Sequence, residues 1–210
     1  MNDEKKQFNK NSVVVKNGVD FDMFVEQAKK DVNKHSKKVI GYTGSLDYRF
    51  DIDLIEFAVQ KLPEYSFEFT GGILNQKVVE RLSNYENVIF HPAVHASEVP
   101  ELVAKFDIGI IPYLLSEINK NIYPLKINEY LAIGIPVVMT EFAVLKDFEN
   151  IACVAKSKEE FVDLIKTQVE NDNSKKIKER IDFARSNSWE SRAKQFGDYI
   201  EKFYKREKVI

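Results

Sequence analysis

A lysine and a glutamate three positions apart stand at the start of a short apolar helix in PLKINEYLAIGIPVV, residues 124–138. Lys126 falls in the first helical turn, where the positive end of the helix dipole opposes a cation by about 0.3–1 kcal/mol. A phosphate above the helix would reverse this penalty, because it would accept hydrogen bonds from the free amides of Leu125 and Lys126 and pair with the ammonium. The pattern therefore indicates an anion-binding helix start, with a Lys126–Glu129 pair on the surface as the plainer alternative.

Glu129 lies one turn deeper in the same helix and would face the same cleft. A carboxylate too far from the phosphates to repel them strongly can accept two hydrogen bonds from the vicinal hydroxyls of a ribose. Phosphate beside ribose indicates a nucleotide. The predicted helix stops at Gly134, which tolerates positive φ, and Pro136 opens the following strand, where its missing N–H does no harm.

Six short apolar runs are predicted to be the strands that position this helix. Each run is nearly continuous in apolar residues and ends in turn residues, as expected of strands buried on both faces: KVIGYTG, SFEFTGG, NVIFHP, DIGIIP, PVVMT and IACVA. Helical patterns occur around residues 52–62, 75–82, 98–105, 124–133, 157–171 and 174–186. This alternation predicts an α/β fold with a doubly wound, Rossmann-like parallel sheet, whose ligands bind at the carboxyl ends of the strands.

Three parts of the chain are predicted. Residues 1–12 have no periodicity and are expected to be a flexible tail or the remnant of a linker, and residues 13–187 form the Rossmann-like domain. Residues 188–210 are expected to form a C-terminal amphipathic helix with Ser188 as its N-cap. The apolar stripe of this helix consists of Phe196, Tyr199, Ile200 and Phe203.

Composition narrows the class of protein. With 210 residues, 44% of them apolar, the chain can bury one substantial core. A formal net charge of -2 gives no global field that would recruit nucleic acid or an anionic membrane, so a charged ligand must be recognised locally. The single cysteine excludes an internal disulfide and fits a reducing cytoplasm. No segment approaches the roughly 20 apolar residues of a membrane span, and the first residues lack the apolar stretch of a signal peptide.

The loop after the first predicted strand, GYTGSLDYRFD, offers several groups to a ligand. Gly41 and Gly44 lack the third glycine of the dinucleotide-binding GxGxxG, and nothing in the chain resembles a Walker P-loop. Two glycines still let the backbone approach a ligand closely, with Ser45 as a donor and Arg49 as an anion contact. A tight turn with a solvated arginine is the equal alternative.

The next two loops give weaker signals. The glycines at 71–72 would let a flat group lie against bare backbone. His91 and His95 are four residues apart, but Pro92 argues against the helix that would bring both onto one metal ion. No metal site is therefore predicted, and a plain loop with Ser97 as the cap of the following helix is expected instead.

Five motifs follow one another in an order and spacing that match a known protein family over residues 13–205. They are NGVD, GYTGSL, FEFTGG, ENVIFHPAVHASEVPELVAKFDIGIIPY and PLKINEYLAIGIPVV. In this succession the chain resembles the C-terminal, donor-binding domain of GT-B glycosyltransferases of family 4, so its fold would be one half of a GT-B fold. The resemblance implies a retaining, metal-independent transferase without a cofactor. It would move a hexosyl group from a UDP- or GDP-linked sugar to a glycan or lipid-linked acceptor, in the cytoplasm or at the inner face of the membrane.

The resemblance also implies roles for individual residues. Glu129 would hold the ribose. Lys126, with the amides of Leu125 and Lys126, would hold the diphosphate and stabilise its charge during transfer, and the backbone of Gly44 would enter the same cleft. The loop that would flank the nucleobase consists of Pro92, Ala93 and Val94.

Two positions depart from the family's pattern. Asn121 stands eight residues before Glu129, where most members have a second glutamate that contacts the donor sugar, and the nearby Glu117 is the candidate substitute. Ser45 replaces the arginine that usually follows the phosphate-loop glycine, so either Arg49 bends in to serve or Lys126 carries the charge alone. A modest donor affinity is expected.

Length is the largest departure. Enzymes of this family bind their acceptor in an N-terminal domain of similar size, and this chain begins where the interdomain linker would lie. We therefore expect the chain alone to bind a donor but hardly to transfer sugar, and the final helix to pack on the domain and across the missing N-terminal one. Two alternatives stay open: a noncatalytic remnant or interaction domain, which Asn121 and Ser45 would suit, and a nucleotide-sugar epimerase of the same architecture.

Overall fold

The computed structural model describes residues 12–28 and 37–207 of the chain. The predicted tail at residues 1–12 therefore lies outside the described part except for its last residue, and so does the end of the predicted C-terminal helix beyond residue 207. Within the described ranges, no helix combines the length and the apolar character that crossing a bilayer would require.

One parallel sheet of six strands forms the centre of the fold, in the order β3-β2-β1-β4-β5-β6. The strands are β1 (Val39–Thr43), β2 (Ser66–Thr70), β3 (Val88–His91), β4 (Ile108–Ile111), β5 (Val137–Thr140) and β6 (Cys153–Ala155). Each lies in a predicted apolar run, and β1, β4 and β5 are buried along their whole length. Ile40 of β1 pairs with Phe67 on one side and with Ile108 on the other, so the direction of winding changes between β1 and β4.

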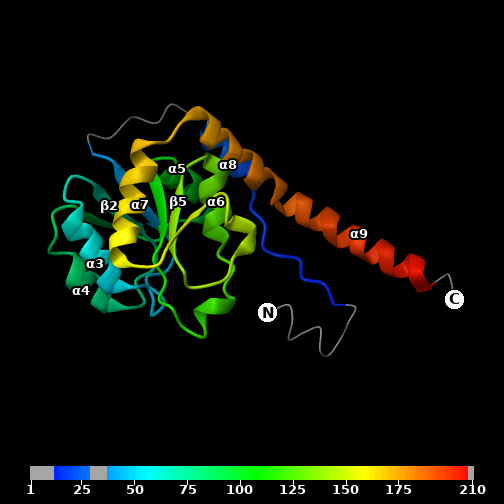
Figure 1. Ribbon diagram of the computed structural model, residues 1–210, viewed down its shortest axis with the longest axis horizontal. Coiled ribbons are helices and arrows are strands. Elements are labelled where there is room, and N and C mark those ends of the chain that lie inside the picture. The colour runs from blue at the N-terminus through cyan, green and yellow to red at the C-terminus, as the bar shows by residue number, and fades with distance from the viewer. Residues whose placement is uncertain (1–11, 29–36, 208–210) are drawn as a thin grey trace.

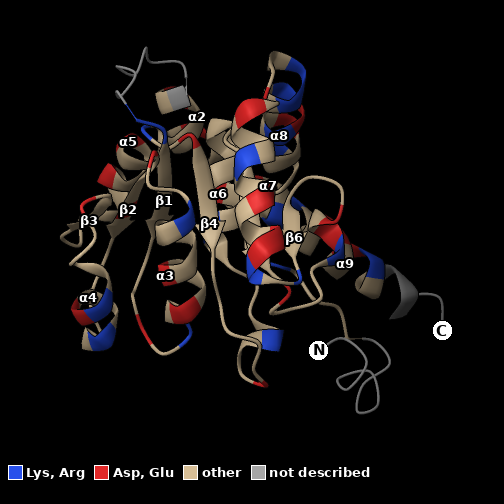
Figure 2. Cartoon of the chain, turned by 60° about the vertical axis from the view of Figure 1, so that its left-hand side comes forward, with Lys and Arg blue, Asp and Glu red and all other residues tan. Residues whose placement is uncertain are grey.

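Helices cover both faces of the sheet and explain why its strands are apolar on both sides. The helices are α2 (Phe21–Ala28), α3 (Ile52–Lys61), α4 (Gln76–Leu82), α5 (Val99–Val103), α6 (Leu125–Ile133), α7 (Lys158–Glu170), α8 (Ser174–Ser186) and α9 (Trp189–Glu207), with 3-10 turns η1 (Ala96–Glu98), η2 (Asn119–Asn121) and η3 (Lys146–Phe148). Helices α2, α5, α6 and α8 pack together on one face, and α3, α4 and α7 on the other (Figure 1). Acidic and basic residues are interspersed along the outer helices α3, α7 and α8 (Figure 2).

The observed elements confirm the predicted doubly wound α/β sheet, and two local details differ. Helix α2 was not predicted from the sequence, although Asp20 marks its start by accepting a hydrogen bond from the Met23 amide at 3.3 Å. The prediction that Ser97 caps the helix after β3 is wrong. The helical turn begins earlier, at η1, and His95 is its N-cap in a capping box with Glu98.

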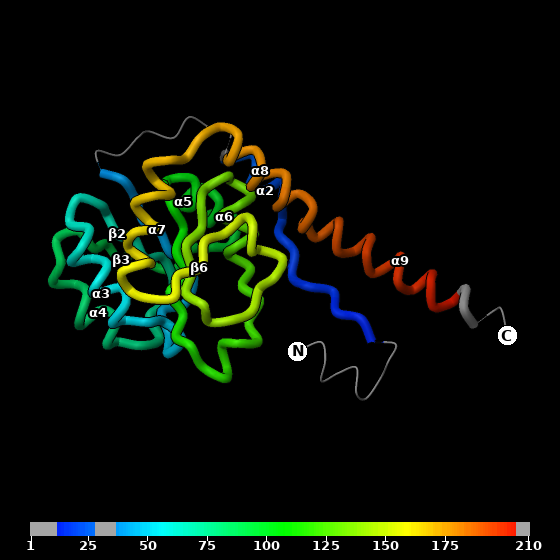
Figure 3. The backbone as a smooth tube through the Cα atoms, in the orientation of Figure 1, coloured from blue at the N-terminus to red at the C-terminus, as the bar shows by residue number. Residues whose placement is uncertain are grey.

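The C-terminal helix α9 begins on the domain and then extends away from it (Figure 1). Ser188 is its N-cap as predicted, since its hydroxyl accepts a hydrogen bond from the Ser191 amide at 3.1 Å. The segment around Val19 runs parallel to this start (Figure 3). Val19 N–H donates to the Asn187 carbonyl at 3.1 Å, and Trp189 N–H donates to the Val19 carbonyl at 3.0 Å. At its first turn the helix is therefore in backbone contact with the segment around Val19.

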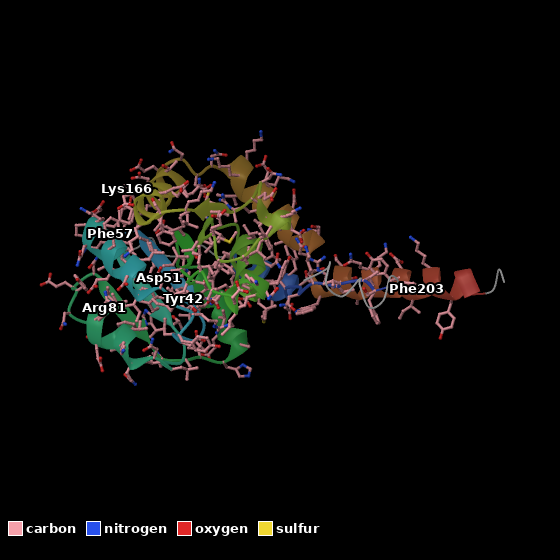
Figure 4. All side chains as sticks on the ribbon, turned by 60° about the horizontal axis from the view of Figure 1, so that its bottom comes forward. Tyr42, Asp51, Phe57, Arg81, Lys166 and Phe203 are labelled. Atoms are coloured by element: carbon pink, nitrogen blue, oxygen red, sulfur yellow. The ribbon has the colours of Figure 1, made fainter. Side chains whose placement is uncertain are left out.

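Farther along α9 the apolar stripe is only partly covered. Figure 4 shows Phe203 on the projecting helix, whereas Tyr42 of β1 lies within the packed body. The large apolar side chains of α9 that are exposed are Trp189, Phe196, Ile200 and Tyr204.

Candidate functional site

The predicted helix start lies at the switch point of the sheet, between the carboxyl ends of β1 and β4. Gly44 follows β1 with a φ of +124°, and a Cβ atom built there would lie 2.8 Å from Lys126 Nζ. Lys126 therefore extends directly over the bare backbone of Gly44. The structure brings these two predicted site residues together, at the place where doubly wound sheets bind their ligands.

Lys126 is a buried cation, with only 9% of its surface exposed. Its Nζ donates a hydrogen bond to the Tyr113 hydroxyl at 3.0 Å and lies 3.9 Å from the centre of the Tyr42 ring. Burial lowers the pKa of Lys126. The alternative of a surface Lys126–Glu129 pair is wrong, because the ammonium is enclosed and is in no ion pair with the described residues. An ammonium has three N–H donors, so two remain for an anion.

Glu129 is partly buried one turn farther along α6, and its carboxylate has no hydrogen-bond partner within the described ranges. Burial raises the pKa of Glu129, and the charge of Lys126 counteracts part of this effect. A carboxylate that is held away from bulk water without a partner is ready to accept hydrogen bonds from a ligand.

Helix α6 is anchored to β1 and is open at its N-terminus. The Tyr130 hydroxyl of α6 accepts a hydrogen bond from the Thr43 amide at 2.9 Å and contacts the Thr43 hydroxyl at 3.1 Å. Pro124 occupies the N-cap position and provides no capping hydrogen bond. The first amides of α6, among them those of Leu125 and Lys126, therefore point their N–H groups at the site without a side-chain acceptor.

Arg49 reaches the same site in company with an aspartate that sequence reasoning missed. Its Nε donates to both carboxylate oxygens of Asp47 at 2.9 Å, and its guanidinium carbon lies 5.5 Å from the centre of the Tyr113 ring. Burial opposes the ionisation of Asp47, but hydrogen bonds from Arg49 outweigh it and hold the pKa of Asp47 below its ordinary value. Arg49 thus bends toward the tyrosine that holds Lys126, with its charge shared by Asp47.

The glycine after β2 serves a different purpose from the predicted one. Gly71 has a φ of +148°, and a Cβ atom there would lie 2.1 Å from the Gly44 carbonyl oxygen. The loops after β1 and β2 are therefore in backbone contact at this point. Gly71 is required by this contact, and its position gives no support for a flat ligand against the backbone.

The remaining predicted residues lie along the same edge of the sheet. Ser45 accepts a hydrogen bond from the Tyr42 hydroxyl through its carbonyl at 2.9 Å. Asn121 is exposed at the end of η2, and the exposed Glu117 forms an ion pair with Lys120. The loop that follows the edge strand β3 carries Pro92, Ala93 and Val94, of which only Val94 is partly buried.

The two histidines of that region have separate partners. His91 Nε2 contacts a Glu68 carboxylate oxygen at 2.9 Å, whereas His95 caps η1. Over residues 12–28 and 37–207, no three histidine, cysteine, aspartate or glutamate side chains come together as a metal site.

Two tyrosines complete the site and were also missed. Tyr42 lies inside the first strand, and Tyr113 follows the proline that ends the fourth apolar run. An aromatic residue at the carboxyl end of a predicted strand was the available signal for Tyr113. Together the groups form a buried cation, an unpartnered carboxylate and an open helix start, an arrangement that can hold a diphosphate and a diol.

Solved structures similar to this chain include a glycosyltransferase and several sugar-phosphate synthases. A glycosyltransferase from Rickettsia africae ESF-5 is similar with a TM-score of 0.72 and 16% identity, over 90% of this chain and 56% of that one. An α,α-trehalose-phosphate synthase (UDP-forming) from Burkholderia xenovorans has a TM-score of 0.71 and 14% identity, over 89% of this chain and 50% of that one. These likenesses confirm that the chain has the fold of one half of a GT-B enzyme.

Sequence relatives give the family. A curated protein of Bacillus subtilis (strain 168), whose name is "Putative teichuronic acid biosynthesis glycosyltransferase TuaH", is 33% identical over 134 residues. The match covers 60% of this chain and 33% of that protein, so the chain spans about a third of the length of this relative. The family model described as "Glycosyl transferases group 1" matches residues 37–171, well over half of the chain. The chain therefore belongs to the group 1 glycosyl transferases.

Proposed function

We propose that this domain binds the nucleotide-sugar donor of a hexosyl transfer at the switch point between β1 and β4. The observation that carries the proposal is the buried Lys126 ammonium above Gly44, at the uncapped start of α6. The oxygens of a diphosphate there would accept hydrogen bonds from the Lys126 ammonium and from the first amides of α6. Ligand binding would thereby offset the free-energy cost of burying the ammonium.

Lys126 would act during the transfer itself. The bond between the anomeric carbon and the diphosphate oxygen breaks, and its electron pair leaves with the nucleoside diphosphate. A bond to the acceptor oxygen forms, and the proton of that oxygen is released. Lys126 and the helix N-terminus would stabilise the charge that develops on the leaving diphosphate, which is the step that electrostatic preorganisation accelerates most. Arg49 would add further N–H donors at the edge of the site, although its charge is shared with Asp47.

Glu129 would bind the ribose, since its unpartnered carboxylate can accept hydrogen bonds from both vicinal hydroxyls. Ser45, Asn121 and Glu117 would line the sugar end. The loop at 92–94 would flank the base. Retention of anomeric configuration and a cytoplasmic location are further parts of the proposal, and both depend on the resemblance to family 4. Uridine is the first base to test, because the Burkholderia neighbour is described as UDP-forming.

The acceptor, a glycan or a lipid-linked one, would be bound mainly by a partner domain outside these 210 residues. This part of the proposal is supported by the share of the solved neighbours that the chain covers, 56% and 50%. The chain alone is therefore expected to bind a donor and to transfer sugar very slowly.

Calorimetric titration with UDP and with GDP tests the proposal. We expect one of the two to bind with a Kd between about 10 µM and 1 mM. Lys126→Ala and Glu129→Ala are each expected to weaken binding at least tenfold. The matched control is the exposed pair Lys175 and Glu179 on α8, whose replacement by Ala should leave the affinity unchanged.

Two results would contradict the donor site. If neither nucleotide bound, the chain would be better described as a noncatalytic interaction module of the same fold. If a nucleotide bound equally well to the Lys126→Ala variant, the site would lie elsewhere. A sugar altered in configuration without any acceptor would instead indicate an epimerase.

A further inference from the structure

A cavity of about 640 Å³ lies beside the proposed donor site, between residues 14–17, 120–123 and 144–147. We call it the linker cavity. The wall at 120–123 leads directly into the N-terminus of α6, and Asn121 belongs to it. Its volume is in the range of small-molecule sites. Its apolar wall consists of Val14, Val15, Ile122, Val144 and Leu145.

Lysines surround this apolar wall. The charged residues that line the cavity are three lysines and one aspartate: Lys16, Lys120, Lys146 and Asp147. Lys16 is paired with Asp147, and Lys120 with the exposed Glu117. Lys146 takes part in no ion pair with the residues that the structure describes. The exposed pair of Lys120 contributes little, so both Lys120 and Lys146 are available to an anion at the mouth.

Exposed apolar side chains occur in the cavity wall and in the segment that precedes the wall at 120–123. Val144, which lines the cavity, is 80% exposed, and Leu115 and Ile118, on the loop before η2, are 69% and 63% exposed. An apolar surface rimmed by lysines is complementary to a lipid that carries a negative head group. A neutral glycan would leave the lysines unused, and a soluble sugar phosphate would leave the valines unused.

We propose that the linker cavity binds a lipid phosphate, the carrier end of a lipid-linked acceptor. The chain of the lipid would lie against Val14, Val15 and Val144, and its phosphate would contact Lys120 and Lys146. Leu115 and Ile118 would touch the lipid surface from which the acceptor is presented. The proposal rests on the proposed function, because it assigns the acceptor's carrier to a place beside the donor sugar at Asn121.

Farnesyl phosphate, titrated calorimetrically below its micelle concentration, is the probe. We expect it to bind the wild-type chain at least tenfold more tightly than farnesol or inorganic phosphate does. Val144→Asp and Lys146→Glu should each weaken it at least tenfold. Leu74→Asp provides the matched apolar control, since Leu74, on the loop after β2, is 73% exposed, close to the 80% of Val144. Lys175→Glu provides the charge control.

The Lys126→Ala variant separates this proposal from the proposed function. It should lose nucleotide binding and keep its affinity for farnesyl phosphate within twofold. Equal binding of farnesol and farnesyl phosphate would overturn the proposal, and so would an affinity that Val144→Asp and Lys146→Glu leave unchanged. Binding to anionic vesicles without binding of monomeric farnesyl phosphate would also overturn it, because the apolar loops would then contact a bilayer without filling the cavity.

Discussion

At the scale of single residues, the site is arranged around a lysine that is unfavourable for the empty protein. Lys126 is buried against Tyr42 and Tyr113 with one hydrogen bond and no counter-ion among the described residues. Cation–π contact and the tyrosine hydroxyl offset part of the loss of hydration. The lowered pKa of Lys126 indicates that the offset is incomplete.

Replacing Lys126 with Met is therefore expected to stabilise the fold while it abolishes nucleotide binding. At pH 7 the free energy of unfolding should rise by about 1 kcal/mol, because a buried charge is replaced by an apolar chain of similar length. Urea denaturation measures this difference. Because the unfolded chain binds more protons than the folded one between the lowered pKa and 10.5, wild-type stability should rise with pH in that window. A Met variant that is less stable at pH 7 would contradict this account.

Donor affinity is expected to follow a bell-shaped pH profile. Binding requires a charged Lys126 and an ionised Glu129, whose pKa values burial moves below 10.5 and above 4.5 respectively. The acid limb of the profile should therefore lie above pH 4.5, and the alkaline limb should lie below pH 10.5. A nucleotide sugar is the suitable ligand for calorimetry from pH 5 to 10, since its doubly substituted diphosphate does not titrate there. The proton that the uracil or guanine ring loses toward the upper end of this range is measured on the free ligand and corrected for. In Glu129→Gln the acid limb should disappear and the alkaline limb should stay. A flat profile in the wild-type protein would exclude both roles.

What the sequence reveals at this scale depends on locality. Lys126, Leu125 and Glu129 are within one helix, so their spacing alone predicted a common site. Asp47 and Tyr113 come from two loops that meet only because β1 and β4 are neighbours in the sheet. No local pattern connects them with Lys126, which is why they were missed.

At the scale of elements, α6 is anchored to β1 through Tyr130 and to α8 at the glycine that ends it. Its last residue precedes Gly134, which has a φ of +90°. The carbonyl of Gly134 accepts a hydrogen bond from Arg180 Nε at 2.6 Å, and the same guanidinium donates to both oxygens of Asp172 at 2.6 Å. Arg180 is buried on α8. We expect this anchor to fix the direction of α6, and with it the place where the first amides of the helix lie.

Arg180→Ala should destabilise the domain by about 3 kcal/mol, because it leaves a carboxylate and a buried carbonyl without their donor. Lys178→Ala on the same helix removes only an exposed pair with Asp182 and should change stability by less than about 0.5 kcal/mol. Urea denaturation of both variants measures the contrast. A loss as small in Arg180→Ala as in Lys178→Ala would mean that α6 does not depend on this anchor.

The elements themselves were largely predictable, for a physical reason. Strands covered on both faces must be apolar throughout, so β1, β4 and β5 are visible as continuous runs. Helix α2 has eight residues, too few for a clear period, and it is stabilised by contact with α5, α6 and α8. The N-cap at His95 was also missed from the sequence. A histidine ring is an uncommon N-cap, and Ser97 matched the usual pattern better.

At the scale of the whole molecule, the domain and its last helix differ in how well they are covered. The body has one continuous core, whereas α9 exposes large apolar side chains after its first turn (Figure 1). Exposed apolar stripes of this size are sites of association. The stability of the domain should not depend on them.

Phe196→Ser combined with Ile200→Ser should therefore leave the free energy of unfolding within about 0.5 kcal/mol of the wild-type value. The same double variant should reduce self-association at high concentration, measured by light scattering after size-exclusion chromatography. Val78→Ser, at a fully buried position on α4, is the contrasting control and should be strongly destabilising. A large loss of stability in the α9 variant would show that this stripe folds back onto the body in solution.

The contact between the segment around Gly18 and the start of α9 has an optical consequence. Trp189 is the only tryptophan in the sequence; it packs against Gly18, where a Cβ atom would lie 3.0 Å from the indole, and it is 50% exposed. Tryptophan emission excited at long wavelength therefore reports on this contact alone. Iodide should quench the emission, and a shift of the emission toward the red should mark the separation of α9 from the segment around Gly18. Trp189 is thus an intrinsic fluorescent probe at the point where the projecting helix α9 leaves the body of the domain.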